Sequence, residues 1–201
     1  MKRNYSKFLK ISPSVLYTVL VLIGFGAGFA VKEFIPLKSK PPALHQPFQQ
    51  ATLLNDPSVS VCFTPNKQCQ TQIIAEINKA KKSIFVQGYS FTDRNIAYAL
   101  VNASKRGVII KVLLDKSNRG DNRSAKDIII QNGIPLRFDS PSGIAHNKVI
   151  ILDEAITISG SYNFSATAYK RNTENLLIIN NKNLAQKYVK NWHSRWEISK
   201  Q

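Results

Sequence analysis

The chain has 201 residues, with 28 Lys and Arg against 12 Asp and Glu, and a formal net charge of +16. This length suits one domain of ordinary size plus a tail, and no internal repeat or second domain is visible. A basic domain is typical of proteins that contact polyanions, either nucleic acid or an anionic membrane surface. A solvated, lysine-rich surface explains the same charge, so composition leaves both interpretations open.

The N-terminus has the pattern of an export signal. Residues 1–10 carry four cations and no acid, and residues 15–31 are uncharged. Small residues at Gly28 and Ala30 predict a cleaved signal peptide over residues 1–30. The alternative is an uncleaved inner-membrane anchor over residues 11–31, which is close to the length that spans a bilayer. We expect a secreted or periplasmic domain in the first case and an anchored domain in the second.

A proline-rich linker is predicted over residues 31–57, and a catalytic domain over residues 58–201. The domain contains two cysteines, Cys62 and Cys69. An even number of cysteines in an exported protein permits a disulfide. Two free thiols are the alternative, and two cysteines alone make a weak zinc site.

Apolar periodicity predicts that strands and helices alternate along this domain. The predicted strands are 58–63, 83–89, 108–114, 135–138, 147–152, 155–159 and 175–179. The predicted helices are 70–81, 93–106, 124–131 and 184–198. The alternation indicates an α/β fold with a mixed, largely parallel sheet flanked by helices on both faces. The most apolar strand, 108–114, is expected at the centre of the sheet.

The most informative stretch begins at His146. Alternate side chains of a strand share a face, so His146 and Lys148 are expected to point to the same place. Ser161 and Asn163 have the same spacing after a second short strand, and Glu174 follows. A nucleophile, a cation, hydrogen-bond donors and a carboxylate suit attack on a phosphodiester. Asp153 lies on the opposite parity to His146, and we expect it to fix the turn.

This stretch resembles the His-x-Lys-x4-Asp motif of the phospholipase D superfamily, followed by its Gly-Ser-x-Asn and Asn-x-Glu-Asn segments. The resemblance is closest to the small members with one motif per chain, which are plasmid-type exported endonucleases and small secreted bacterial phospholipases D. Further landmarks of that subgroup are Val61-Cys-Phe-Thr-Pro65, Tyr89-Ser-Phe-Thr92, Lys105-Arg-Gly-Val108, Gly133-Ile-Pro-Leu136 and Trp192-x3-Trp196.

The resemblance implies a phospholipase D-like fold and a mechanism that needs neither cofactor nor metal. In the family, one motif histidine forms a phosphohistidine and a second protonates the leaving group. Because this chain has one motif, the resemblance implies a homodimer with the active site at the two-fold interface. The implied catalytic set is His146, Lys148, Asp153 and Glu174, in which Glu174 is expected to accept a hydrogen bond from an imidazole N–H and fix its tautomer. Lys148, Ser161 and Asn163 would bind the phosphate.

The sequence is compatible with two classes of substrate. The first is a phospholipid of the phosphatidylcholine type, cleaved to phosphatidic acid outside the producing cell, with a role in virulence or membrane remodelling. The second is DNA or RNA, cut without sequence preference by the same mechanism. A non-catalytic binding protein is a third hypothesis, which the intact motif disfavours.

Overall fold

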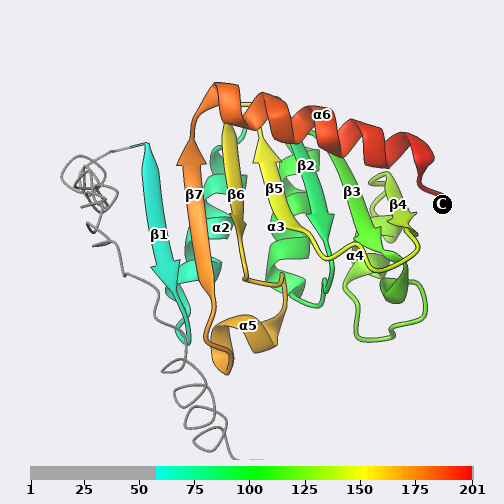
Figure 1. The fold of residues 1–201 in the computed structure, drawn as a ribbon, viewed down its shortest axis with the longest axis horizontal. Coiled ribbons are helices and arrows are strands. Elements are labelled where there is room, and N and C mark those ends of the chain that lie inside the picture. Colours follow the sequence, from blue (N-terminus) through cyan, green and yellow to red (C-terminus); the bar gives the residue numbers. More distant parts are fainter. Residues whose placement is uncertain (1–57, 201) are drawn as a thin grey trace, which may run out of the picture. The chain divides into compact units, whose positions relative to one another are not determined.

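The computed structural model describes residues 58–200, so the predicted leader and linker (residues 1–57) lie outside the described residues. The described part is an α/β domain built on a seven-stranded sheet (Figure 1). Its strands are β1 (Val59–Phe63), β2 (Ser83–Gly88), β3 (Ile109–Asp115), β4 (Leu136–Asp139), β5 (Lys148–Leu152), β6 (Ile156–Gly160) and β7 (Asn175–Asn180). Its helices are α2 (Gln68–Lys79), α3 (Arg94–Lys105), the 3-10 turn η2 (Lys116–Asn118), α4 (Lys126–Gln131), α5 (Ala166–Lys170) and α6 (Lys182–Ile198). None of these helices has the length and apolarity needed to cross a membrane.

The sheet is mixed, as predicted, but its parallel part is smaller than expected. The strand order is β1-β7-β6-β5-β2-β3-β4. Among the described strands, β2, β3 and β4 pair in parallel, and the other pairings are antiparallel. Parallel neighbours need a crossover, which α3 and α4 supply. After β4 the chain returns through a loop into β5 and then turns directly into β6, which forces antiparallel pairing.

The central strand is β5 and not β3, which corrects the expectation from apolarity. Strand β3 lies next to the edge strand β4 but is covered on both faces. Val112 and Leu114 pack with the helices of one face, and Leu113 packs with the opposite face. High apolarity therefore reports burial on both faces and not the position in the sheet.

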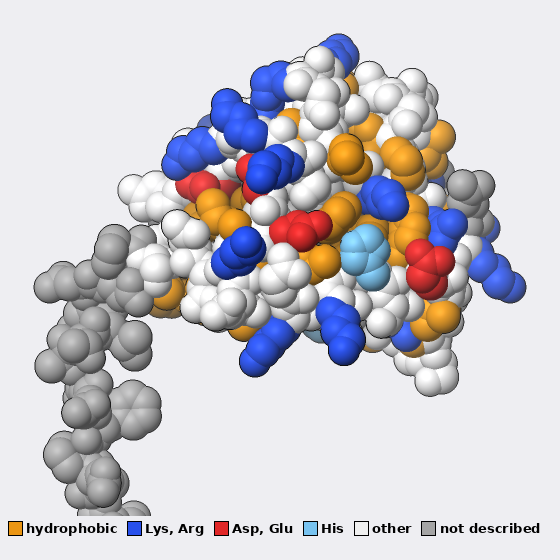
Figure 2. All heavy atoms as spheres, turned by 90° about the horizontal axis from the view of Figure 1, so that it is seen from above, with side chains coloured by type: hydrophobic (Ala, Val, Ile, Leu, Met, Phe, Trp, Pro, Cys, Tyr) orange, Lys and Arg blue, Asp and Glu red, His pale blue; other side chains and the backbone are white. Residues whose placement is uncertain are grey.

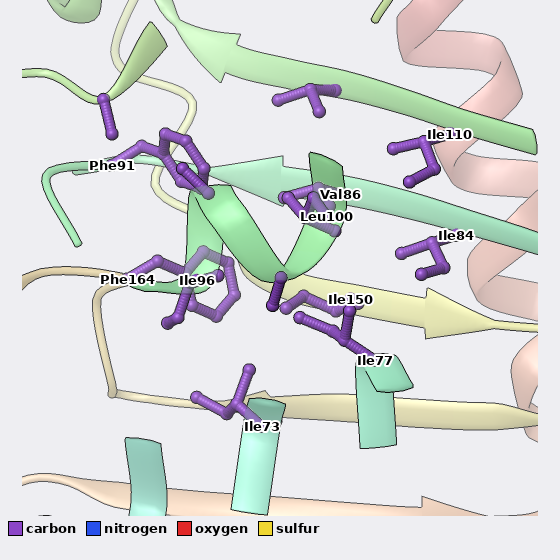
Figure 3. Close-up of a cluster of buried hydrophobic side chains, with 14 of the residues drawn as sticks. Ile73, Ile77, Ile84, Val86, Phe91, Ile96, Leu100, Ile110, Ile150 and Phe164 are labelled. Atoms are coloured by element: carbon purple, nitrogen blue, oxygen red, sulfur yellow. The ribbon is translucent and has the colours of Figure 1, made fainter. Parts of the chain in front are cut away.

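Helices α2, α3 and α4 cover one face of the sheet, and α6 crosses the other (Figure 1). The larger core contains Ile73 and Ile77 of α2 against strand residues such as Ile84 and Ile150 (Figure 3). Even-numbered residues of β2 and β5 face this core, and odd-numbered ones face α6. Helices on both faces are therefore confirmed, and period-two alternation is the reason that each strand serves both layers.

Helix α6 covers its face mainly with tryptophan. The Trp192 ring stacks on Phe85 at 4.8 Å between ring centroids and on Trp196 at 4.9 Å. The Trp192 indole also donates a hydrogen bond to the Val86 carbonyl at 2.9 Å. The tryptophan stripe is core, as its spacing predicts, and truncating a ring of this kind costs about 3–5 kcal/mol.

Candidate active site

Most of the predicted site residues lie along one edge of the sheet. Strands β1, β2, β3, β4 and β6 run in one direction and end at this edge, where β5 and β7 begin. It is the lower edge in Figure 1, and we call it the active-site edge. Carboxyl ends of strands in such sheets are the usual place for ligands, because the loops that leave them are free to carry function.

His146 lies in the loop just before β5, and Lys148 is the first residue of that strand. Both contact Tyr89, which follows β2. The His146 ring meets the Tyr89 ring edge-on at 4.6 Å between centroids, and the Lys148 ammonium lies 5.2 Å from the Tyr89 centroid. The Lys148 ammonium also donates to the His146 carbonyl at 2.9 Å. The structure therefore brings His146 and Lys148 together, and Tyr89 is the residue that joins them.

The imidazole of His146 is exposed, and it makes no hydrogen bond to any residue in the range 58–200. Lys148, in contrast, is buried, with 7% of its surface exposed. Burial lowers the pKa of the Lys148 ammonium below its ordinary value, while the charge of Glu174 acts in the opposite direction. A free imidazole next to a desolvated cation suits nucleophilic attack on phosphorus with charge stabilisation beside it.

The loop that carries His146 is held by Asp115 at the end of β3. The Asp115 carboxylate accepts hydrogen bonds from the backbone N–H of Ala145 at 2.7 Å and of Ser117 at 2.9 Å. Burial alone would raise the pKa of Asp115, but these N–H donors and Lys116 outweigh it and lower the pKa. An ionised, buried carboxylate thus fixes the residue directly before His146.

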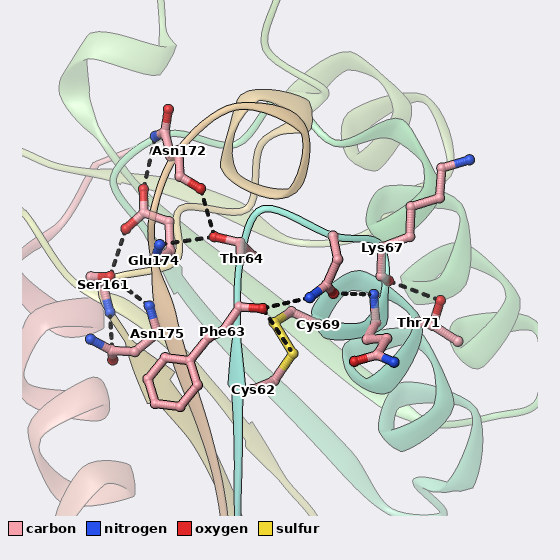
Figure 4. Close-up of a disulfide and its surroundings, with 12 residues drawn as sticks. Cys62, Phe63, Thr64, Lys67, Cys69, Thr71, Ser161, Asn172, Glu174 and Asn175 are labelled. Atoms are coloured by element: carbon pink, nitrogen blue, oxygen red, sulfur yellow. Dashed lines mark hydrogen bonds between the residues drawn. A yellow bond between two sulfur atoms is a disulfide. The ribbon is translucent and has the colours of Figure 1, made fainter.

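Glu174 directly precedes β7, and its carboxylate accepts hydrogen bonds from Ser161 and Asn172. The Ser161 hydroxyl donates to Glu174 Oε2 at 2.6 Å, and the Asn172 amide donates to Oε1 at 2.8 Å (Figure 4). Thr64, after β1, fixes the same segment by accepting from the Glu174 N–H at 2.8 Å and donating to the Asn172 carbonyl at 2.8 Å. Within this chain Glu174 therefore orients Ser161 and Asn172, and the predicted Glu174–imidazole hydrogen bond is not formed.

Asn163 follows β6 at the same edge, and its side-chain oxygen Oδ1 is buried without a hydrogen-bond partner among the described residues. A buried acceptor of this kind has lost its water and gains from a donor brought by a ligand. Gly160, at the end of β6, has a φ of +147°, and a Cβ there would collide with the Asn175 carbonyl. The absence of a side chain at Gly160 lets β6 approach β7 closely, which places Ser161 beside Glu174.

Asp153 is not brought to His146. It lies at the other end of β5, in the turn to β6, where Asp153 and Glu154 have positive φ values of 51° and 55°. Its carboxylate accepts from the backbone N–H groups of Lys81 at 2.9 Å, Lys82 at 2.7 Å and Ser83 at 3.0 Å. Burial would raise the pKa of Asp153, but these N–H donors lower it. The geometry matches a turn-fixing role and not a catalytic one.

Cys62 and Cys69 form a disulfide in the structure, with Cα atoms 5.5 Å apart. The bond joins the end of β1 to the start of α2, beside the Thr64–Glu174 contacts (Figure 4). His193 contacts Phe85 and Trp192 on the α6 face, away from the Lys148 face of β5. No group of three or more metal-binding side chains occurs within residues 58–200.

Cations are not confined to the active-site edge. Figure 2 views the domain from above relative to Figure 1, and Lys and Arg side chains are spread over the visible surface with few acids among them. Several loop cations near the site have local partners: Lys116 donates to the Pro141 carbonyl at 3.1 Å, and Arg123 pairs with Asp121 at 3.1 Å. Charge alone therefore does not identify the substrate.

An exposed imidazole, a buried ammonium and a fixed set of hydroxyl and amide groups define a phosphodiesterase site. Comparisons with known proteins agree. A family model described as "Cardiolipin synthase, PLD-like domain" matches residues 73–196. The phospholipase D of Rickettsia prowazekii (strain Madrid E) is 38% identical, over 97% of this chain and 96% of the relative.

Two solved structures resemble the domain closely. Nuc from Salmonella typhimurium, described as a phospholipase D family member, is 38% identical with a TM-score of 0.69, covering 72% of this chain and 97% of Nuc. NucT from Helicobacter pylori is 25% identical with a TM-score of 0.64, covering 71% of this chain and 97% of NucT. The chain belongs to the phospholipase D family, and it is a phosphodiester hydrolase of that family.

Proposed function

We propose that the protein is an exported phospholipase D that hydrolyses phospholipid headgroups and releases phosphatidic acid. The observation that carries the proposal is the exposed, unbonded His146 imidazole next to the buried Lys148 ammonium. The phospholipid substrate is supported by similarity to the Rickettsia phospholipase D, which extends over almost the whole chain.

In the proposed first step an imidazole nitrogen of His146 attacks phosphorus, and the bond to the headgroup oxygen breaks. That oxygen takes a proton from a second imidazole. In the second step the same imidazole removes a proton from water, which attacks phosphorus and releases His146. Lys148 and Asn163 bind the phosphate oxygens throughout, whereas Ser161, which the sequence predicts to bind phosphate as well, donates its only hydroxyl proton to Glu174.

The second imidazole is proposed to be the His146 of another copy of the chain. Within the described residues the other histidine is His193 of α6, which packs against Phe85 and Trp192. A two-fold axis beside His146 would supply both groups to one phosphate. It would also place a second Glu174 near the first His146, where it would accept from the imidazole as the resemblance implies.

Nucleic acid is the second candidate substrate. It is supported by the net charge of +16 and by the 38% identity to Nuc. The same histidine and lysine chemistry would cut a nucleic-acid phosphodiester, since the reacting group is identical.

The test offers purified protein phospholipid vesicles and plasmid DNA in parallel, with EDTA present. We expect release of phosphatidic acid, undiminished by EDTA because His146 and Lys148 supply the nucleophile and the charge. His146→Asn should lower turnover by on the order of 10⁶, as removal of a nucleophile can. His193→Asn, the matched control, should keep turnover near wild type. Cleavage of DNA with no lipid hydrolysis would replace the first proposal by the second, and a tenth of wild-type turnover in His146→Asn would overturn both.

A further inference from the structure

A hollow of about 510 Å³ adjoins the active site on the side of β3. Its lining includes Tyr89 and Ser90 after β2, and Ser117, Asn118 and Arg123 in the loop after β3. Tyr89 lines this hollow and also contacts the His146 imidazole, with 4.6 Å between the two ring centroids. A group attached to a phosphate at His146 can therefore extend into the hollow.

A second hollow of about 300 Å³ meets the first at Ser90 and Arg123. It runs toward Asn163 and Asn172, and its other lining residues, Thr92, Ser165 and Thr167, are hydroxylic. We call the two hollows together the Ser90 groove. Most of its lining side chains carry hydroxyl or amide groups, and the others include the Tyr89 ring, the Asp121 carboxylate and the Arg123 guanidinium at the junction.

The groove offers an acceptor that lacks a donor. The Asn163 Oδ1 atom is buried and has no hydrogen-bond partner among residues 58–200. A buried acceptor recovers its lost hydration only from a donor, and a hydroxyl group of a ligand is such a donor. The exposed Arg123 guanidinium has five N–H donors, and its pair with Asp121 uses its Nε and Nη2. A ligand with several hydroxyl groups would satisfy both residues.

The groove is poorly suited to a quaternary ammonium group such as choline. Such cations bind to an open aromatic face or to a free carboxylate. The aromatic residue is Tyr89, which already has the Lys148 ammonium 5.2 Å from its centroid. The carboxylate is Asp121, which already pairs with the Arg123 guanidinium at 3.1 Å. A choline cation would therefore meet two positive charges and no unoccupied negative one.

We infer that the Ser90 groove binds the headgroup of the substrate and selects a hydroxyl-bearing headgroup without positive charge, as in phosphatidylglycerol, over choline. The inference rests on the proposed phospholipase function and narrows it. Ser90 and Arg123 are the residues that determine the preference, because both hollows share them.

The test measures kcat/KM for phosphatidylglycerol and phosphatidylcholine in mixed micelles of a neutral detergent. The phosphatidylcholine micelles also carry an equal amount of an anionic alkyl sulfate, so that both surfaces attract a basic protein alike. We expect phosphatidylglycerol to be preferred by at least about tenfold, since a site with polar groups aimed at substrate hydroxyls disfavours a headgroup lacking them. Arg123→Glu and Ser90→Ala should move the ratio of the two values toward one.

Lys105→Glu is the matched control, because it makes the same charge change at an exposed position at the far end of α3. It should leave the ratio unchanged, and an equal shift in Lys105→Glu and Arg123→Glu would show a bulk charge effect and overturn the inference. Phosphatidylcholine hydrolysed as fast as phosphatidylglycerol would also overturn it while leaving the phospholipase function intact. Absence of hydrolysis of either lipid, with cleavage of DNA, would instead remove the proposed function itself.

Discussion

At the scale of single residues, the site combines one solvated group with one desolvated group. His146 is exposed and Lys148 is buried, although they are two positions apart and share Tyr89 as a neighbour. The exposed imidazole can reach a phosphate in a bulky substrate. The buried ammonium acts in a medium of lower dielectric constant, where its attraction for a phosphate oxygen is stronger than in water.

Burial of Lys148 has a consequence for the pH dependence of activity. The pKa of its ammonium lies below the ordinary value of 10.5, so the free enzyme loses this proton at a lower pH than an exposed lysine does. If the charged form binds phosphate, kcat/KM falls as pH rises through this lowered pKa. The fall in kcat should come at higher pH, because the charge of bound substrate favours the ammonium.

The control for this prediction is Lys148→Arg, since a guanidinium stays charged throughout the accessible pH range. The variant should be slower, because a planar fork does not replace a point charge, but its kcat/KM should lack the alkaline fall. An unchanged alkaline fall in Lys148→Arg would assign that titration to another group.

At the scale of elements, the turn that follows β6 and carries Ser161 depends on Gly160. A Cβ there would meet the Asn175 carbonyl, and its φ of +147° is unfavourable for other residues. We expect Gly160→Ala to lower the free energy of unfolding by about 1–3 kcal/mol, the usual cost of such backbone strain. Turnover should fall with it, because Ser161 would move away from Glu174.

The measurement is the midpoint of urea unfolding together with turnover of each variant. Gly143→Ala is the matched control for stability, because a Cβ at Gly143 would have no atom within 4 Å and the residue has no positive φ. Equal unfolding midpoints for Gly160→Ala and wild type would contradict the account of the turn.

The Cys62–Cys69 disulfide is a second feature that stabilises the arrangement of elements. Cys62 and Cys69 close a short loop between β1 and α2, and such a loop contributes roughly 2–3 kcal/mol in the chain-entropy model. Reduction should therefore lower the melting temperature of the wild-type protein. The double variant Cys62→Ala, Cys69→Ala should melt lower from the start and should not respond to reductant. Two alkylatable thiols in non-reduced protein recovered from the periplasm or the medium would contradict this prediction.

Helices and strands could be predicted where a pattern of apolar and polar residues within one short segment defines them. The strand 147–152, the polar turn at Asp153 and the strand 155–159 follow from an apolar run on each side of two charged residues, and they appear as β5 and β6. The predicted helix 93–106 appears as α3, and Asp93 caps it by accepting hydrogen bonds from the N–H groups of Asn95 and Ile96. Helix α5 was not predicted, because five residues are too few for a helical period to show.

The contacts that assemble the site could not be predicted, because they join residues far apart in sequence. Asp115 holds Ala145 across 30 positions, and Thr64 holds Glu174 across 110. Neither contact can be read from a motif, and only the strand order brings these residues to the active-site edge. Tyr89 lies in a segment that resembles the family, but its contact with His146 needs β2 next to β5.

At the scale of the whole molecule, the decisive question is how many chains make one site. The described part of the chain places one histidine at the active-site edge, while the proposed two-step reaction uses two. If both come from His146 of different subunits, a subunit that lacks a wild-type partner has no complete site. The prediction is therefore about a mixed dimer, in which the single composite site contains His146 from one subunit and the asparagine of the His146→Asn variant from the other.

The experiment co-expresses tagged wild-type chains with an excess of untagged His146→Asn chains, so that nearly every dimer recovered through the tag is mixed. Its turnover should be close to that of the pure His146→Asn protein, because either the nucleophile or the proton donor is missing from its site. A mixed dimer of wild-type and His193→Asn chains, prepared in the same way, should keep near full turnover. Half of the wild-type turnover in the His146 mixture would mean that each chain holds a complete site. His193 or a water molecule would then have to transfer the second proton, and the dimer would have no catalytic part in the reaction.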